Sequence, residues 1–246
     1  AGCSPLLFTS YVNQSNLSDE WFEATKLLPP DEREAMVLNR PKPPSGLVYQ
    51  EFSLERHIID DFKYSPEMTG RIAIDWGFRK PSVLILAYDE EREASVIVAE
   101  INPQEVTIAQ LSLMILQIAW PRELRDQAPG PRIWLDSGCA DKAGKARNDQ
   151  TGRSAFREIA KPIEQGGIGM PLRSTTDPTR TDILNGVQRL KRAFNRSRYL
   201  ITREVWAKGE RASGNSLRKA LMSYAWDNKE QPKKDGREDP LDALRY

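Results

Sequence analysis

Two aspartates in the sequence, Asp75 and Asp136, each end a short apolar run and stand two residues before a glycine. Near the end of the sequence, Asp239 and Asp242 lie at the start of an expected helix. Carboxylate oxygens are the ligands that hard divalent cations prefer. Acids at two strand ends and at one helix start therefore predict a binding site for such cations.

These acids suit a phosphodiesterase site with two metal ions. Two divalent ions about 3.5–4 Å apart stabilise the attacking and departing oxygens of an in-line displacement, and they need bridging carboxylates rather than a histidine base. Asp75 is the expected bridging ligand, Asp136 completes one ion site and Asp239 the other, while Asp242 ligates or orients. Helix capping alone would also explain Asp239 and Asp242, because Pro240 suits the first helical position.

A further acid, Glu100, closes an expected strand, and a solvated strand end is the favoured interpretation of it. The only histidine, His57, lies in a polar stretch outside any motif and is expected to be solvated, which argues against histidine-based acid–base or triad chemistry. The two cysteines, Cys3 and Cys139, are far apart and predict neither a disulfide nor a zinc site.

Charge divides the 246 residues unevenly. Residues 1–135 carry 13 lysines and arginines against 20 acids, a net charge of −7, and the remaining residues carry 23 against 15, a net charge of +8. A polyanion would be expected to meet the second half, although ordinary solvated helix faces explain the charge equally well. Seven basic residues near the acids are candidates to contact the phosphate backbone of a nucleic acid, although ordinary solvated loops explain them equally well: Lys142, Lys145, Arg147, Arg153, Lys233, Lys234 and Arg237.

One stretch resembles a phosphate loop without being one. Five residues, rather than four, separate Gly138 from Gly144, and Ala146 has no hydroxyl group to hold Mg²⁺. The chain is therefore not expected to hydrolyse ATP by itself. The longest apolar helical run, 108–120, is too short to cross a bilayer, and the first residues lack the pattern of a signal peptide, so a cytoplasmic protein with no membrane partner is expected.

Hydrophobic periodicity predicts the order of elements after residue 70. Strands at 71–76, 83–88 and 95–101 are expected to form an antiparallel meander. A helix capped by Thr107 is expected to run to about residue 125. The remaining expected elements are a strand at 132–135, a helix at 154–165, a short strand at 168–172, a helix at 182–194, a strand at 199–202, a helix at 217–224 and the final helix. Strands followed by alternating strands and helices predict an α/β fold with a mixed central sheet.

The residues before this body have a different composition. Helices are expected from the Ser18 cap to about residue 28 and from about residue 29 to 38. Prolines and glycines then interrupt the chain, and no core-forming period precedes Arg71. We therefore expect a linker or junction segment at 1–68 and the main domain at 69–246.

Taken together, the motifs resemble a known family. Ile-Asp-Trp-Gly around Asp75, Trp-Leu-Asp-Ser-Gly around Asp136 and the terminal Asp-Pro-Leu-Asp-Ala-Leu-Arg-Tyr resemble the nuclease domain of large terminase subunits, the DNA-packaging motors of tailed double-stranded DNA bacteriophages. Residues 32–52 resemble the linker between the ATPase and nuclease domains of that family. The order of elements is also similar to that of the ribonuclease H-like fold.

The resemblance implies a ribonuclease H-like fold and an Mg²⁺- or Mn²⁺-dependent endonuclease, with two ions, that cuts concatemeric viral DNA with little sequence preference. By motif position it implies Asp75, Asp136 and Asp239 or Asp242 as ligands. It also implies a missing ATPase domain, a small terminase subunit and a portal as partners, and the host cytoplasm as location. Two alternatives stay open: a junction-resolvase or integrase-like nuclease on the same fold, and a non-catalytic module for DNA binding or motor docking.

Overall fold

A computed structural model describes residues 10, 15–26, 37, 46–76, 80–130, 132–146, 153–174, 183–212, 214–226, 232 and 238–245. The chain forms two compact units, Ala1–Gly46 and Leu47–Tyr246. The structure thus places the division at 46/47 rather than at the predicted 68/69. Residues 47–68 belong to the second unit because their apolar side chains, including Val48 and Tyr49, are buried in its core.

The described part of the first unit contains helix α1 (Asp19–Lys26). The Ser18 hydroxyl accepts a hydrogen bond of 3.2 Å from Trp21 N, which confirms the predicted cap at the start of this helix. The helix expected at 29–38 lies outside the described residues except for Val37.

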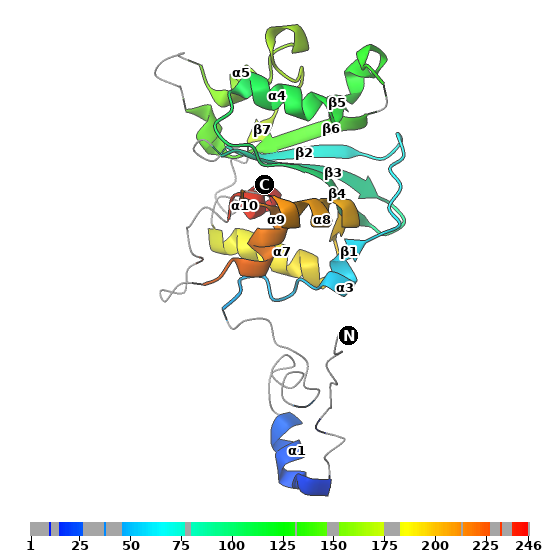
Figure 1. The fold of residues 1–246 in the computed structure, drawn as a ribbon, viewed down its shortest axis with the longest axis vertical. Coiled ribbons are helices and arrows are strands. Elements are labelled where there is room, and N and C mark those ends of the chain that lie inside the picture. Colours follow the sequence, from blue (N-terminus) through cyan, green and yellow to red (C-terminus); the bar gives the residue numbers. More distant parts are fainter. Residues whose placement is uncertain are drawn as a thin grey trace. The chain divides into compact units, whose positions relative to one another are not determined.

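The second unit is built on an eight-stranded mixed sheet (Figure 1). Its strands are β1 (Ile58–Ile59), β2 (Gly70–Asp75), β3 (Ser82–Asp89), β4 (Ala94–Ile101), β5 (Ala119–Pro121), β6 (Ile133–Ala140), β7 (Arg173–Ser174) and β8 (Tyr199–Thr202). The order across the sheet is β1-β8-β4-β3-β2-β6-β5, with β7 paired to β6. Strands β2, β3 and β4 pair antiparallel as predicted, whereas β2 pairs parallel with β6. The carboxyl ends of β2 and β6 therefore lie side by side.

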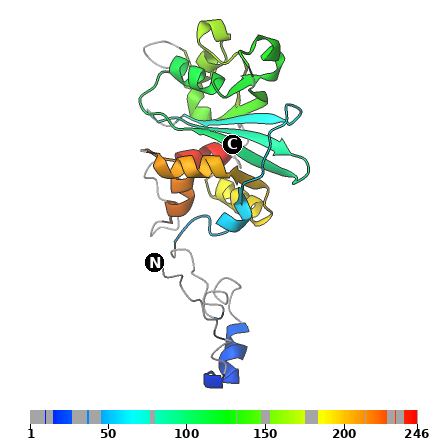
Figure 2. The same ribbon diagram turned by 45° about the vertical axis from the view of Figure 1, so that its right-hand side comes forward.

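Helices cover both faces of this sheet, as Figures 1 and 2 show. The α-helices in the described part of this unit are α3 (Leu54–His57), α4 (Ile108–Leu116), α5 (Ala155–Ile159), α7 (Ile183–Asn195), α8 (Arg203–Arg211), α9 (Leu217–Ser223) and α10 (Asp239–Arg245). Alternate residues of β2 supply the two cores, since Ile72 and Ile74 pack on the face with α4 and α5, and Ala73 packs on the face with α7 to α10. None of the described helices has the length and apolar character needed to span a membrane.

The helix predicted at 107–125 is confirmed at its start and wrong at its end. Thr107 forms the expected cap, with its hydroxyl accepting from Gln110 N at 3.2 Å and its own N–H donating to Gln110 Oε1 at 2.8 Å. The helix stops at Leu116, and β5 and a 3₁₀ helix, Arg122–Gln127, follow.

The helix predicted at 154–165 likewise breaks into α5 and a 3₁₀ helix, Ile163–Gln165. The strand predicted at 168–172 does not form, and β7 begins at Arg173.

The strand predicted to end at Leu135 continues to Ala140. Asp-Ser-Gly is a sequence that also suits a turn, but Gly138 lies within β6, opposite Ile72 of β2. A Cβ atom on Gly138 would lie 2.5 Å from Leu172 Cδ2 and 2.6 Å from Ile72 Cγ2. Gly138 therefore permits close packing against Ile72 and Leu172 and does not form a turn. The carboxyl end of β6 lies five residues later than predicted, at Ala140.

The expectation of a solvated His57 is wrong. The side chain is fully buried and its ring stacks on Phe52 at 5.3 Å. Its Nε2 atom donates to Phe194 O at 2.8 Å and its Nδ1 atom accepts from Ser53 N at 2.9 Å, an assignment that satisfies both ring nitrogens with one neutral tautomer. This histidine is a structural element of the core.

Candidate metal centre

Asp75 stands at the carboxyl end of β2 and is only 8% exposed. It lies on the same face of the strand as Ala73, because side chains two residues apart along a strand share a face. That face packs against α10, which contacts both β2 and β3. The alternation of the strand therefore directs the Asp75 carboxylate toward the helix that carries the terminal acids.

A second acid reaches the same place from β6. Ala140 is paired with Ile74, and the next residue, Asp141, donates its N–H to Ile74 O at 3.0 Å. Its carbonyl oxygen accepts from Trp76 Nε1 at 3.0 Å, so both backbone groups of Asp141 are held by the end of β2. Asp141 is not among the acids that the sequence patterns indicated as candidate ligands. The small residues before it were the available signal, because Gly-Cys-Ala can continue a tightly packed strand.

The terminal acids arrive on α10. Leu241 N and Asp242 N both donate to Glu238 O at 2.8 Å, which closes the first turn and places Asp239 and Asp242 in it. Leu241 is fully buried and anchors the helix on the sheet. The structure therefore brings Asp75, Asp239 and Asp242 together, as predicted, and adds Asp141 to them.

Burial and mutual repulsion raise the pKa values of these carboxyl groups. Burial, followed by the charges of Asp242, Asp239 and Asp141, raises the pKa of Asp75 to about 8. Burial raises the pKa of Asp242 to about 7, against the opposing effect of Arg245, and burial together with Glu238 raises the pKa of Asp239 to about 6. Groups of this kind are stabilised in their ionised form by a nearby cation.

Asp136 does not join this cluster. Asp136 is a residue of β6 and lies beside the first residues of β2, not beside the end that carries Asp75. Its neighbours Leu135 and Ser137 are paired with Gly70 and Arg71. Four to five residues along the strand separate that position from Asp75, a distance of roughly 13–16 Å. This separation exceeds the reach of a pair of bridged ions, so the expectation that Asp136 shares their site is wrong.

The surroundings of Asp136 give it a structural role instead. Its carboxylate accepts two hydrogen bonds from Arg122, at 2.5 and 3.0 Å, and one from Gly70 N at 2.8 Å. Partial burial raises the pKa of Asp136, but the Arg122 and Gly70 hydrogen bonds outweigh burial and hold that pKa below its ordinary value. Arg122 also donates to the carbonyl oxygens of Pro66 and Met68, at 2.6 Å each, so the pair fastens the segment before β2 to β6.

Glu100 also has a structural role. Its Oε1 atom accepts from Asn102 Nδ2 at 2.6 Å and from Leu217 N, the first residue of α9, at 2.5 Å. Burial raises the pKa of Glu100 despite these hydrogen bonds. The favoured expectation of a solvated strand end is therefore wrong for Glu100, which holds the start of α9.

Some of the predicted DNA contacts fall within the described residues. Lys142 and Lys145 are exposed on a 3₁₀ helix that follows Asp141 directly, and Lys145 lies 6.0 Å from the centre of the Phe156 ring. Arg153 forms an ion pair with Glu158 at 3.6 Å. The other four, Arg147, Lys233, Lys234 and Arg237, lie outside the described residues. Lys80, which was not among the predicted contacts, is an exposed cation whose charge lowers the pKa of Asp239 against the larger effect of burial.

The donor set fits divalent cations, because it consists of buried carboxylates that repel one another. Among the described residues, however, no three acid, histidine or cysteine side chains are arranged to hold an ion as they stand. In addition, the Asp242 Oδ1 atom is engaged in an ion pair with Arg245. Binding of an ion would therefore require a rearrangement of side chains within an already assembled cluster.

Gly144→Ala tests how Asp141 is held. A Cβ atom on Gly144 would lie 2.0 Å from Trp76 Nε1, the atom that donates to Asp141 O. We expect the variant to displace the indole ring and to lose about 1–3 kcal/mol of unfolding free energy, measured by urea denaturation. Ala143→Ser, an exposed change of one atom in the same short helix, should stay within about 0.5 kcal/mol of the unmodified protein. Equal stability of the Gly144→Ala variant would contradict this packing.

Comparisons with known proteins bear on the fold. No protein-family model matches the chain. In sequence it is 24% identical over 216 residues to the large terminase subunit of Escherichia phage T5, and the match covers 82% of this chain and 41% of that protein. The chain thus spans about two fifths of the length of this curated relative.

Two solved structures have a similar fold. The nuclease domain of the P22 large terminase gives a TM-score of 0.57 at 15% identity, covering 82% of this chain and 90% of that one. The large terminase of a thermophilic bacteriophage gives a TM-score of 0.57 at 16% identity, covering 98% of this chain and 54% of that one. These comparisons confirm the predicted resemblance to large terminase nuclease domains and the α/β, ribonuclease H-like fold, a mixed central sheet flanked by helices.

Proposed function

We propose that this chain is the nuclease domain of a phage large terminase and acts as a divalent-metal-dependent endonuclease on concatemeric double-stranded DNA during genome packaging. The observation that carries the proposal is the convergence of Asp75, Asp141, Asp239 and Asp242 at one end of the sheet, from β2, β6 and α10. The similarity to terminase nuclease domains supports the same activity.

The four acids act together in the proposed reaction. Asp75 interacts electrostatically with Asp141 and with both acids of α10, and these four carboxylates would hold the ions. Two Mg²⁺ or Mn²⁺ ions held there would supply stabilisation for the attacking and leaving oxygens of an in-line phosphodiester displacement. The protein contributes the placement of the carboxylates and their burial, which strengthens their interaction with cations.

The proposed DNA contact lies beside the acids. Lys142 and Lys145 follow Asp141 directly, and the charge of Lys80 acts on Asp239, so exposed cations accompany the acids from two segments of the chain. Contacts of this kind bind phosphates without reading base sequence, which agrees with a nuclease of little sequence preference. In this proposal an ATPase domain, a small terminase subunit and a portal are the partners, and the reaction takes place in the host cytoplasm.

A plasmid-nicking assay tests the proposal. Supercoiled DNA is incubated with the protein in Mg²⁺, in Mn²⁺ and in chelator, and nicking is expected only with the metals. Linear and branched DNA are compared in the same assay. A clear preference for branched DNA would instead support a resolvase-like nuclease, and DNA retention without any cutting would support a non-catalytic binding module.

The raised pKa values predict how stability depends on pH. The folded-state pKa of Asp75, about 8, and that of Asp242, about 7, exceed the ordinary carboxyl value, so between about pH 4 and 8 the folded chain binds more protons than the unfolded chain. In chelator, the unfolding free energy should therefore fall as the pH rises through this window. Because metal binding displaces these protons, Mn²⁺ should stabilise the protein more at about pH 8 than at about pH 5.5.

Thermal unfolding at both pH values, with Mn²⁺ and with chelator, measures this difference. In Asp75→Asn the unfolding free energy should depend less on pH, because the amide of asparagine does not titrate. A larger stabilisation by Mn²⁺ at the lower pH would contradict the placement of these acids in one buried cluster.

A further inference from the structure

The side chain of Arg245, in the last turn of α10, is only 6% exposed and forms an ion pair with Asp242. Space for it is provided by Gly186 of α7, where a Cβ atom would lie 2.8 Å from Arg245 Cδ. The Asp242 Oδ1 atom in this pair accepts no hydrogen bond of normal geometry from the described residues. The buried pair thus holds one Asp242 oxygen by charge.

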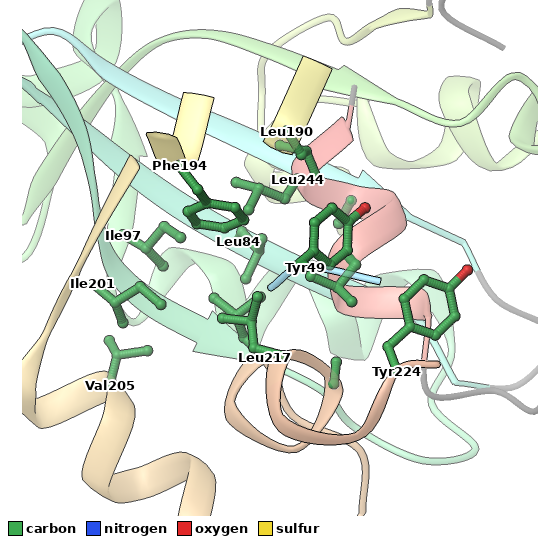
Figure 3. Packing of buried hydrophobic residues seen from close by; sticks show 14 of the residues in the cluster. Tyr49, Leu84, Ile97, Leu190, Phe194, Ile201, Val205, Leu217, Tyr224 and Leu244 are labelled. Carbon is green, nitrogen blue, oxygen red and sulfur yellow. The ribbon is translucent and has the colours of Figure 1, made fainter. Parts of the chain in front are cut away.

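Two buried tyrosines lie beside this ion pair. Tyr49 and Tyr224 are 2% and 3% exposed, and their rings are stacked 6.2 Å apart, centre to centre. Figure 3 shows the two rings next to α10 with their hydroxyl groups on the same side. Both hydroxyl groups interact electrostatically with Arg245 and with Asp242. The described residues include no hydrogen-bond partner for the buried Tyr49 hydroxyl, and the charge of Arg245 is the strongest that acts on it.

Tyr49 belongs to the segment 47–52, with which the second unit begins. This segment is fastened on both sides of Tyr49: Val48 N donates to Tyr224 O at 2.8 Å, and Glu51 forms an ion pair with Lys191 at 3.1 Å. The Tyr49 ring also meets Phe194 edge-on at 5.9 Å. The hydroxyl of Tyr49 is therefore held in place by packing that does not depend on Arg245.

We propose that Tyr49 is a positioning residue that holds the Arg245 guanidinium against Asp242 and so couples the segment 47–52 to the metal centre. The metal part of this inference rests on the proposed function. Outer-shell groups that orient ligands commonly change metal affinity when they are removed, although they do not touch the ion. Tyr49 thereby influences the carboxylate cluster through the side chain of Arg245.

Tyr49→Phe is the test, because it keeps the ring in the core and removes only the hydroxyl group. We expect the affinity for Mn²⁺, measured by calorimetry on the whole chain, to fall by about 10-fold. Tyr199→Phe is the matched control: it is the same chemical change on a ring that also packs on Phe194, at 6.4 Å, but the phenol faces Arg71 and Arg189 instead of Asp242. The control should change the affinity by less than about 2-fold.

A second readout needs no metal. In nuclear magnetic resonance spectra of the protein in chelator, the Arg245 side-chain Nε–H signal should shift or broaden in Tyr49→Phe and stay in place in Tyr199→Phe. An unchanged Arg245 signal in Tyr49→Phe would overturn the inference, whatever the metal data show. Failure of the unmodified protein to bind Mn²⁺ would overturn the proposed function instead, and the arginine signal would still decide whether Tyr49 positions Arg245.

Discussion

Asp75→Asn is expected to lower Mn²⁺-dependent plasmid nicking by about 1,000-fold or more, which corresponds to about 4 kcal/mol of transition-state stabilisation. The reason is its central position: its carboxylate interacts with acids from both neighbouring elements, Asp141 beyond β6 and Asp242 on α10. An asparagine side chain has nearly the same shape, but it provides no negative charge to hold a cation.

The same variant should fold at least as well as the unmodified protein when metal is removed. Because the pKa of Asp75 is raised to about 8, ionisation of this buried carboxyl group lowers the unfolding free energy. The amide of asparagine stays neutral and avoids this loss. Nicking rate, DNA retention and unfolding free energy are therefore measured on the same preparation. Undiminished nicking would remove Asp75 from the mechanism, and a loss of folding would leave Asp75→Ser as the variant to decide it.

Asp141→Asn and Asp136→Asn should have opposite consequences. Asp141 follows Ala140 at the end of β6 beside Asp75, so its amide variant should lose nicking by about 100-fold or more. Asp136 is engaged with Arg122 at the other end of the paired strands, so its amide variant should nick at close to the normal rate. It should instead lose about 1 kcal/mol of unfolding free energy, since the Arg122 pair is partly exposed.

This comparison of two chemically identical changes decides whether Asp136, within β6, or Asp141, directly after it, belongs to the proposed metal centre. It uses the nicking assay for activity and urea denaturation for stability. If Asp136→Asn abolished nicking while Asp141→Asn did not, the strand register described above would be incompatible with the working enzyme.

Local sequence signals were sufficient for several elements. Short runs of apolar and β-branched residues located β2, β3, β4 and β8, and Thr107 located the start of α4. Asp75, Asp239 and Asp242 could be selected because each ends a strand or begins a helix, which are local properties. The mixed sheet with helices on both faces followed from the order of these elements.

Properties that depend on contacts between residues far apart in the sequence could not be predicted from such local signals. Whether β6 ends at Leu135 or at Ala140 depends on the fit of Gly138 against Ile72 and Leu172, and neither partner is close to it in sequence. The wrong strand end selected Asp136 in place of Asp141. The burial of His57 depends in the same way on Phe194, more than a hundred residues away along the chain.

The order of the three acid-bearing segments along the chain has a consequence for the newly made protein. Asp75 on β2 leaves the ribosome first and Asp141 follows, while the helix with Asp239 and Asp242 comes 164 residues after Asp75. At 5–20 residues per second, that interval is roughly 8–33 s. During synthesis β2 with Asp75, and β6 followed by Asp141, therefore emerge before the acids of α10, so the cluster of four carboxylates forms only after α10 has been made.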